Sequence, residues 1–356
     1  DRARADRGAR VGAPAAPGPR GSPRPVIALD VNGADAGAAV VVEGARRAAT
    51  AVTLFGPAAE IADPPGEVVD APVAIGGDEE PARAVRSKPD ASIVQAARAV
   101  GGGGAGALVS AGATGAALAA SLLHVKRSRG VSRPAIAVLL PVPGHPTLLL
   151  DAGANVEVRP EHLVQFGLMG AAFMRAVHGV ERPRVGLLSV GEEATKGTSD
   201  VVEAHARLAA LEAGDMAFTG NVEGDAVTAG AVDVVVTDGF TGNVALKVME
   251  GAAKTVVGAV RGAIRSSPLA SVGGLLVRGR LAGLRRELDP NTTGGAVLLG
   301  LRRPVVVAHG ASSAEGIANA VRLARRAVDA RAVERTAAAL SDWALRSAGT
   351  ASVAGP

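Results

Sequence analysis

The feature that most constrains this chain is a recurring unit: a short apolar run, a polar glycine-rich turn, and then an alanine-rich stretch. Continuous apolar runs predict strands that are buried on both faces of a sheet, and their alternation with helices predicts parallel strands. The unit recurs at 26–35, 107–115, 148–155, 185–197, 232–243 and 305–313. We therefore predict an α/β fold with three αβα layers and a largely parallel sheet.

Three regions follow from this pattern. Residues 1–24 are rich in Arg, Ala, Pro and Gly without periodicity, a composition that predicts a disordered extension. Residues 25–335 form the predicted α/β domain, and 336–356 form a C-terminal helix and tail. The segment 139–146 carries three Pro and predicts a hairpin, which would add antiparallel pairing to the sheet.

Composition excludes several classes of protein. The chain has no Cys, so disulfides, thiolate chemistry and Cys-ligated zinc are excluded. Aromatic residues make up 2% of the chain and the net charge is only +4, which argues against nucleic-acid binding. No secretory signal and no long apolar span are visible, so we expect a cytoplasmic protein.

The familiar motifs of cofactor and covalent chemistry are also missing from the sequence. We find no G-x-G-x-x-G after a strand, no G-x-x-x-x-G-K-[ST], no H-E-x-x-H and no G-x-S-x-G. The six His are scattered along the chain. The sequence thus predicts no metal site, no nucleotide cofactor and no serine-hydrolase nucleophile.

The glycine-rich turns instead favour anion binding. Ser110 and Thr114 lie where a strand passes into a helix, and a helix N-terminus favours a phosphate or an oxyanion. The segment 237–247 repeats this arrangement, and its Asn243 and Lys247 are one helical turn apart on a shared face. The alternative is that these residues only cap helices, with Lys247 a solvated surface side chain.

Two further loops carry groups suited to acid–base work. Glu192, Glu193 and Lys196 follow a predicted buried strand, where they could orient a substrate, a water or an Arg, or else form a solvated loop. His309 follows the strand at 305–307 and could act as an acid–base group or as an oxyanion donor. A structural role for His309 is equally compatible with the sequence.

In chain order, these loops resemble the bacterial phosphate acyltransferases of fatty acid and phospholipid synthesis, the PlsX family. The resemblance covers the chain from about Pro25 to about Ala330. Its motifs include Ile27-Ala-Leu-Asp30, Ser110-Ala-Gly112, Arg133-Pro-Ala135, Gly153-Ala-Asn155, Gly191-Glu-Glu193, Lys196-Gly197, Gly220-Asn-Val-Glu-Gly224, Asp238-Gly-Phe240, Gly242-Asn-Val-Ala-Leu-Lys247 and His309-Gly310. One such motif is weak evidence, but the ordered set is specific.

The resemblance implies transfer of an acyl group from acyl carrier protein to inorganic phosphate. It implies a fold like that of phosphate acetyltransferases and isocitrate or isopropylmalate dehydrogenases, and a homodimer at the inner face of the plasma membrane that supplies a glycerol-phosphate acyltransferase. Candidate catalytic residues are Lys247, His309 and Glu192. Candidate substrate- or phosphate-binding residues are Asp30, Ser110, Thr114, Asn155, Lys196, Asn221, Asp238 and Asn243.

The residues themselves fit this chemistry, because phosphate is its own nucleophile and the protein need only bind an anion and polarise a thioester carbonyl. Two loops depart from the family pattern, since Ala34 replaces a Gly and Ala113 replaces an Asn. The basic pair that usually precedes Asp-Ser is also altered, at 86–91. The substitutions at Ala34 and Ala113 leave open a catalytically weakened membrane-associated scaffold. The shared fold leaves open an enzyme that uses acyl-CoA, like phosphate acetyltransferases.

A basic segment at 252–286 stands apart from these loops, because it carries seven Lys or Arg and no acidic residue. Apolar residues are interleaved with the basic ones, a composition that predicts a protruding surface helical hairpin. Its basic face could contact anionic lipid or an acidic carrier protein, or it could be a solvated helix pair at a dimer edge. The residues we assign to this contact are Arg278, Arg280, Arg285 and Arg286.

Overall fold

A computed structural model of the chain describes residues 25–142, 145–211, 214–287 and 289–353. Within this part of the chain, eleven strands form one sheet in the order β3-β2-β1-β4-β11-β10-β5-β6-β9-β7-β8. The strands are β1 (Ile27–Asp30), β2 (Val52–Gly56), β3 (Glu67–Asp70), β4 (Ala107–Ser110), β5 (Ala135–Leu140), β6 (Thr147–Leu150), β7 (Arg184–Leu188), β8 (Ala217–Val222), β9 (Val234–Val236), β10 (Ala296–Leu299) and β11 (Val305–Val307).

The sheet has two parallel halves joined by antiparallel strands. Strands β3, β2, β1, β4 and β11 are parallel to one another, and so are β6, β9, β7 and β8. Between the halves, β10 and β5 pair antiparallel with each other and with the flanking strands β11 and β6. This confirms the predicted α/β fold and the hairpin, in which Leu140 pairs with Thr147.

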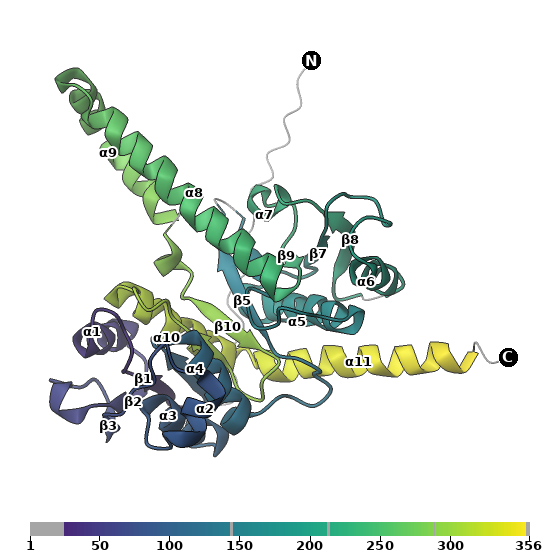
Figure 1. Ribbon diagram of the computed structural model, residues 1–356, viewed down its shortest axis with the longest axis horizontal. Helices are drawn as coiled ribbons and strands as arrows, with labels where there is room; N and C mark the ends of the chain where they lie inside the picture. Colours follow the sequence, from purple (N-terminus) through teal and green to yellow (C-terminus); the bar gives the residue numbers. More distant parts are fainter. Residues whose placement is uncertain (1–24, 143–144, 212–213, 288, 354–356) are drawn as a thin grey trace.

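Helices cover both faces of the sheet (Figure 1). One apolar cluster joins the sheet to α1, α5, α6, α10 and α11, and two others join it to the helices of the opposite face, α2–α4 and α7–α8. The helices are α1 (Ala38–Ala48), α2 (Pro81–Ser87), α3 (Ser92–Gly101), α4 (Thr114–Ala120), α5 (Pro160–His178), α6 (Ser199–Ala209), α7 (Ala226–Ala229), α8 (Gly239–Arg265), α9 (Pro268–Glu287), α10 (Ala314–Asp329) and α11 (Ala332–Val353). Three single turns complete the elements, η1 (Ala58–Glu60), η2 (Ser121–Val125) and η3 (Pro290–Thr292).

The central strands are apolar on both faces because both of their faces are covered. In β1, Ile27 and Leu29 belong to one core cluster and Ala28 to the cluster on the opposite face. In β10, Val297 and Leu298 divide in the same way. The continuous apolar runs in the sequence therefore reflect double-sided burial, as expected for a parallel sheet.

Helices α8 and α9 form the hairpin predicted from the basic segment, and it projects away from the body of the molecule (Figure 1). Gly273 and Gly274 do not interrupt α9. A Cβ added at Gly274 would lie 2.3 Å from Ile264 Cγ2 on α8, so the glycine permits close contact between the two helices. Among the described residues, no helix is long and apolar enough to span a membrane.

Two of the predicted regions, residues 336–356 and residues 1–24, can be compared with the bounds of the described elements. Helix α11 begins at Ala332 and so crosses the predicted boundary at residue 336. The predicted disordered extension, residues 1–24, lies outside the described residues.

Candidate active site

The first polar group lies at the carboxyl end of β1. Asp30 is 2% exposed and accepts hydrogen bonds from Ser92 Oγ (2.5 Å) at the start of α3 and from Ser110 Oγ (2.7 Å) at the end of β4. Asn32 Nδ2 donates to Ser92 Oγ (3.1 Å) and to the Ala71 carbonyl (3.0 Å). The carboxylate thus joins three elements beneath the loop that follows β4.

Burial raises the pKa of Asp30 from 3.8 to about 6, and the hydrogen bonds from Ser110 and Ser92 oppose this rise. The two oxygens of this buried carboxylate each accept a hydrogen bond from a hydroxyl group of the protein. We therefore infer that Asp30 positions Ser110 and its loop.

The loop after β11 joins the same group. The Ala308 amide donates to the Ser110 carbonyl (2.8 Å), and the Asp35 amide donates to the Gly310 carbonyl (3.0 Å). His309 is exposed, and its Nδ1 accepts a hydrogen bond from the Ala311 amide (3.1 Å). In a neutral ring with this bond, Nε2 carries the proton and can donate outward.

Helix α4 begins in this group with an open N-terminus. Its N-cap residue Ala113 has no side chain that can cap the helix, and Thr114 is exposed. The amides of a first helical turn have no partners within the helix. A Cβ added at Gly33, whose φ is +85°, would lie 2.8 Å from Gly112 Cα, so a glycine there lets the loops after β1 and β4 touch.

The second polar group surrounds Asp151, which follows β6 and is fully buried. Its Oδ1 accepts hydrogen bonds from the amides of Ile136 (2.9 Å), Gly153 (3.2 Å) and Ala154 (3.0 Å). Its Oδ2 accepts from the backbone amide (2.7 Å) and the side-chain Nδ2 (2.8 Å) of Asn155. Burial raises the pKa of Asp151, and the hydrogen bonds from the loop act in the opposite direction.

Helix α8 docks on this loop through glycines. The Gly239 amide donates to the Asn155 carbonyl (2.7 Å), and a Cβ added at Gly242 would lie 2.0 Å from the Asp151 carbonyl oxygen. Asn243 Nδ2 donates to the Ala152 carbonyl (3.2 Å). A larger side chain at residue 242 would push the helix away from the loop.

At the α8 N-terminus, fewer backbone amides are available to an anion than the sequence suggests. Asp238 caps the helix by accepting from the Thr241 amide (2.8 Å), and Gly239 donates to Asn155, so two first-turn amides already have acceptors. The exposed polar groups that remain nearby are Asn243 and Lys247, and Lys247 Nζ pairs with Glu250 Oε2 (3.0 Å). Anion binding at this helix would therefore rely more on side chains than on the amides.

The third group is the loop after β7. Ser189 Oγ donates to the Lys196 carbonyl (2.9 Å), and Asn221 Nδ2 donates to the Glu193 carbonyl (2.8 Å). Asn221 is buried, and its Oδ1 has no hydrogen-bond partner among the described residues. The side chains of Lys196 and Glu192 are exposed.

The structure thus brings some of the predicted site residues into contact with one another, within each of the three polar groups. Asp30 and Ser110 are bonded to each other, Asn155 contacts the α8 N-terminus that bears Asp238 and Asn243, and Asn221 contacts the backbone of Lys196. The first two groups flank one apolar cluster, against which Ala113, Ala154 and Leu246 pack. Among the described residues, no hydrogen bond or ion pair joins the third group to the other two.

Sequence reasoning missed several residues of the site. Ser92 reaches Asp30 because α3 packs on β1, and Asn32 in turn bonds to Ser92. No local pattern marks the contact between Ser92 and Asp30, which are 62 positions apart. Asp151 did have a signal in the sequence, since an Asp that begins a Gly-containing turn after a strand commonly organises the loop.

Among the described residues, no group of three His, Asp or Glu could hold a metal ion.

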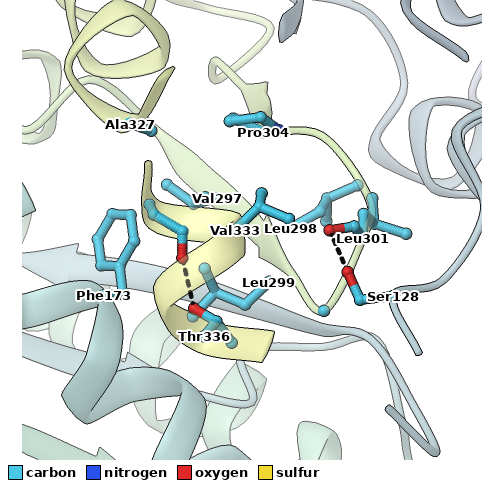
Figure 2. A pocket seen from close by; sticks show the side chains of 12 residues that line it. Ser128, Phe173, Val297, Leu298, Leu299, Leu301, Pro304, Ala327, Val333 and Thr336 are labelled. Atoms are coloured by element: carbon cyan, nitrogen blue, oxygen red, sulfur yellow. Dashed lines mark hydrogen bonds between the residues drawn. The ribbon is translucent and has the colours of Figure 1, made fainter. Parts of the chain in front are cut away.

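A small apolar cavity lies elsewhere, between β10 and helices α5, α10 and α11 (Figure 2). Its volume is about 20 Å³, room for about one water molecule. It is lined by Phe173, Val297, Leu299, Ala327, Thr336 and neighbouring residues, none of which is a candidate catalytic residue. The candidate site therefore lies in the polar loops and not in this cavity.

Two solved phosphotransacetylase structures share this fold. The chain resembles the EutD phosphotransacetylase from Staphylococcus aureus (TM-score 0.54, 17% identity, covering 85% of this chain and 94% of that one). It also resembles a phosphotransacetylase from Streptococcus pyogenes (TM-score 0.55, 18% identity, covering 87% and 94%). These likenesses show the fold, an α/β architecture that the chain shares with solved phosphotransacylases.

Sequence relatives identify the family. Residues 26–335 match the family described as "Fatty acid synthesis protein". The chain is 44% identical over 317 residues to the phosphate acyltransferase of Elusimicrobium minutum, covering 85% of this chain and 92% of that protein. It is 44% identical over 324 residues to the phosphate acyltransferase of Thermobifida fusca, covering 87% and 90%. The chain belongs to this family, the bacterial phosphate acyltransferases, and is an acyltransferase.

The buried Asp30 predicts a pH-dependent stability. Because its pKa is raised in the folded state, its stabilising contribution is complete below the ordinary value of 3.8 and is lost as the pH rises to about 6. We expect the free energy of unfolding of wild type, minus that of Asp30→Asn, to fall across this window by on the order of 3 kcal/mol. Urea unfolding at a series of pH values measures the difference, and a flat difference curve would contradict the assignment.

The uncapped α4 N-terminus generates a second prediction. An Asn at an N-cap accepts a hydrogen bond from a first-turn amide, so Ala113→Asn should raise the free energy of unfolding by about 1 kcal/mol. It should leave acyltransferase activity equal or higher. Ala119→Asn, inside the same helix, serves as the control and should not stabilise. A large loss of activity in Ala113→Asn would show that this loop has acquired another role.

Proposed function

We propose that this acyltransferase transfers a fatty acyl group from acyl carrier protein to inorganic phosphate, giving an acyl phosphate for phospholipid synthesis. The observation that carries the proposal is the 44% identity to phosphate acyltransferases over most of the chain. The polar groups in those loops suit the binding of a small anion, with phosphate as the nucleophile.

In the proposed reaction, a phosphate oxygen attacks the thioester carbonyl carbon and a C–O bond forms. The C–S bond then breaks, and the carrier thiolate leaves and takes up a proton. The protein needs to orient the phosphate and to stabilise the charge that develops on the carbonyl oxygen. No covalent intermediate on the protein is required.

The exposed residues divide between binding and proton transfer. Thr114 at the start of α4, and Asn243 with Lys247 on α8, would hold the phosphate and the carbonyl oxygen. Asn155, Asp238 and Asn221 are held against backbone groups and would position these loops. His309, through Nε2, or Lys247 would protonate the leaving thiolate, with Glu192 and Lys196 in the third loop contacting the substrate.

The proposal predicts which donor the enzyme accepts. Wild-type protein should form acyl phosphate and release free carrier from acyl-acyl carrier protein and phosphate, in an assay with acyl-CoA as a parallel donor. Activity with acyl-CoA alone would favour a phosphate acetyltransferase-like enzyme, and no activity with either donor would favour a scaffold. Lys247→Ala should lower kcat/KM for phosphate by about 100-fold.

A matched variant separates the Lys247 charge from its ion pair. Glu250→Gln removes the partner that lies 3.0 Å from Nζ and leaves the ammonium in place. We expect this variant to retain most of the wild-type activity. An equal loss in both variants would indicate that the pair matters only for the conformation of α8.

We also propose that the chain acts as a homodimer associated with the inner face of the plasma membrane, and the α8–α9 hairpin supports this membrane contact. A glycerol-phosphate acyltransferase would take up the product there. Leu269, Leu275 and Leu276 are 82%, 67% and 83% exposed on α9. Arg278 and Arg280 are exposed on the same helix, while the side chains of Arg285 and Arg286 lie outside the described residues. Apolar side chains beside basic ones suit the surface of an anionic bilayer.

A liposome flotation assay tests this surface. Changing Arg278, Arg280, Arg285 and Arg286 together to Glu should abolish flotation with phosphatidylglycerol vesicles, since each basic residue contributes about 1 kcal/mol near such a surface. Arg182→Glu, on the body of the protein, is the charge-reversal control. Unchanged flotation of the fourfold variant would rule out a role for this basic face in lipid binding.

A further inference from the structure

A second basic surface lies on the body of the protein, away from the hairpin. The sequence has no Asp or Glu between Asp90 and Asp151, and none between Asp289 and Glu315. Lys126, Arg127, Arg129, Arg133, Arg302 and Arg303 lie in these two stretches. We call these six residues the body patch.

The two segments that carry the body patch lie side by side. Arg127 and Leu301 form an antiparallel bridge, and the Arg302 amide donates to the Lys126 carbonyl (3.0 Å). Ser128 Oγ donates to the Leu301 carbonyl (2.7 Å), a contact visible in Figure 2. Basic residues about 175 positions apart in the chain are thereby gathered on one small area.

The charges of the body patch are not neutralised by neighbours. All six side chains are exposed. Among the described residues, none of the six forms an ion pair with a carboxylate. Arg302 Nε donates to the Arg127 carbonyl (3.1 Å), and Arg127 donates to the Ser132 carbonyl, so these two guanidinium groups are held in place by backbone oxygens. Fixed, unpaired cations attract an anionic partner.

The body patch is anchored to the candidate active site. Gln165 of α5 is buried, accepts from the Ser132 amide (2.9 Å) and donates to the Gly130 carbonyl (3.0 Å). The next residues of this loop reach the site, because the Pro134 carbonyl accepts a hydrogen bond from Asn155 Nδ2 (2.8 Å). A partner bound at the body patch therefore lies next to the Asp151–Asn155 loop.

We propose that the body patch is the docking surface for the acidic face of acyl carrier protein, a proposal that rests on the proposed function. Carboxylates on the carrier would pair with these unpaired cations and hold the carrier beside the strand-end loops. The thioester at the end of its flexible arm would then enter the site from this side. The hairpin is left free to contact lipid.

Two other anionic partners fit the body patch less well. The chain has 2% aromatic residues, and the segments 126–133 and 301–303 contain none, so nucleic-acid bases would have nothing to stack on. The apolar residues of these segments, Val131 and Leu301, are 6% and 1% exposed. They offer nothing to insert into a bilayer, in contrast to the exposed leucines of the hairpin.

Steady-state kinetics with acyl-acyl carrier protein test the body patch. Arg129→Glu and Arg303→Glu, singly and together, should raise KM for acyl-acyl carrier protein, by about tenfold in the double variant. The KM for phosphate and kcat should stay near wild type, because the variants leave the site intact. Added salt should raise the wild-type KM towards that of the double variant. Arg182→Glu is the charge-matched control for each single variant.

Fluorescence anisotropy can measure the binding of holo-acyl carrier protein directly, so the docking surface is tested without relying on the acyl transfer reaction. If wild type makes no acyl phosphate but binds the carrier through the body patch, the proposed function fails and the docking surface stands. An unchanged KM and an unchanged carrier affinity in the double variant would overturn the docking surface. The docking surface would also be overturned if the double variant lost binding to phosphatidylglycerol vesicles or to RNA while its affinity for the carrier stayed intact.

Discussion

The structure depends on buried carboxylates at the ends of strands. Asp151 is fully buried and accepts five hydrogen bonds, from Ile136, Gly153, Ala154 and both amides of Asn155. Asp30 has the corresponding place in the other half of the sheet, where it accepts from Ser92 and Ser110. Each carboxylate replaces the water it loses with hydrogen-bond donors from the protein, which for Asp151 come mostly from its own glycine-containing loop. That loop cannot move without leaving a buried carboxylate unpaired.

Rigid loops of this kind explain how a chain with no Cys and 2% aromatic residues can form a site for acyl transfer. When phosphate is the nucleophile, the protein contributes position and electrostatics, and backbone amides, hydroxyls and a few cations are sufficient. The glycines that touch neighbouring backbone, such as Gly33 and Gly242, allow these groups to approach each other closely. The hairpin and the body patch add two separate surfaces, one suited to lipid and one to an acidic protein.

The fold could be predicted well from the sequence, and the site only in part. Apolar runs such as 148–150 mark strands because burial on both faces excludes polar residues there, and the alternation with helices implies parallel pairing. The polar strand-end loops were also visible. The partners of their side chains were not visible: the sequence predicts Asp30 and Asn155 as substrate-binding residues, and the structure adds that both bond to protein groups. A side chain's partners depend on distant segments, which no local pattern encodes.

By itself, the sequence determined the α/β class, the strand-end loops, the helical hairpin and, through the order of its motifs, the family. Apart from the family, these properties depend on the spacing of apolar residues and on the backbone preferences of neighbouring residues, which are local features of the sequence. Only the tertiary structure decided that Ser92 supports Asp30, that α8 docks through Gly242, and that Arg129 and Arg303 lie on adjoining segments. Those contacts join residues far apart in the chain, and they form because burying both faces of the sheet forces the segments together.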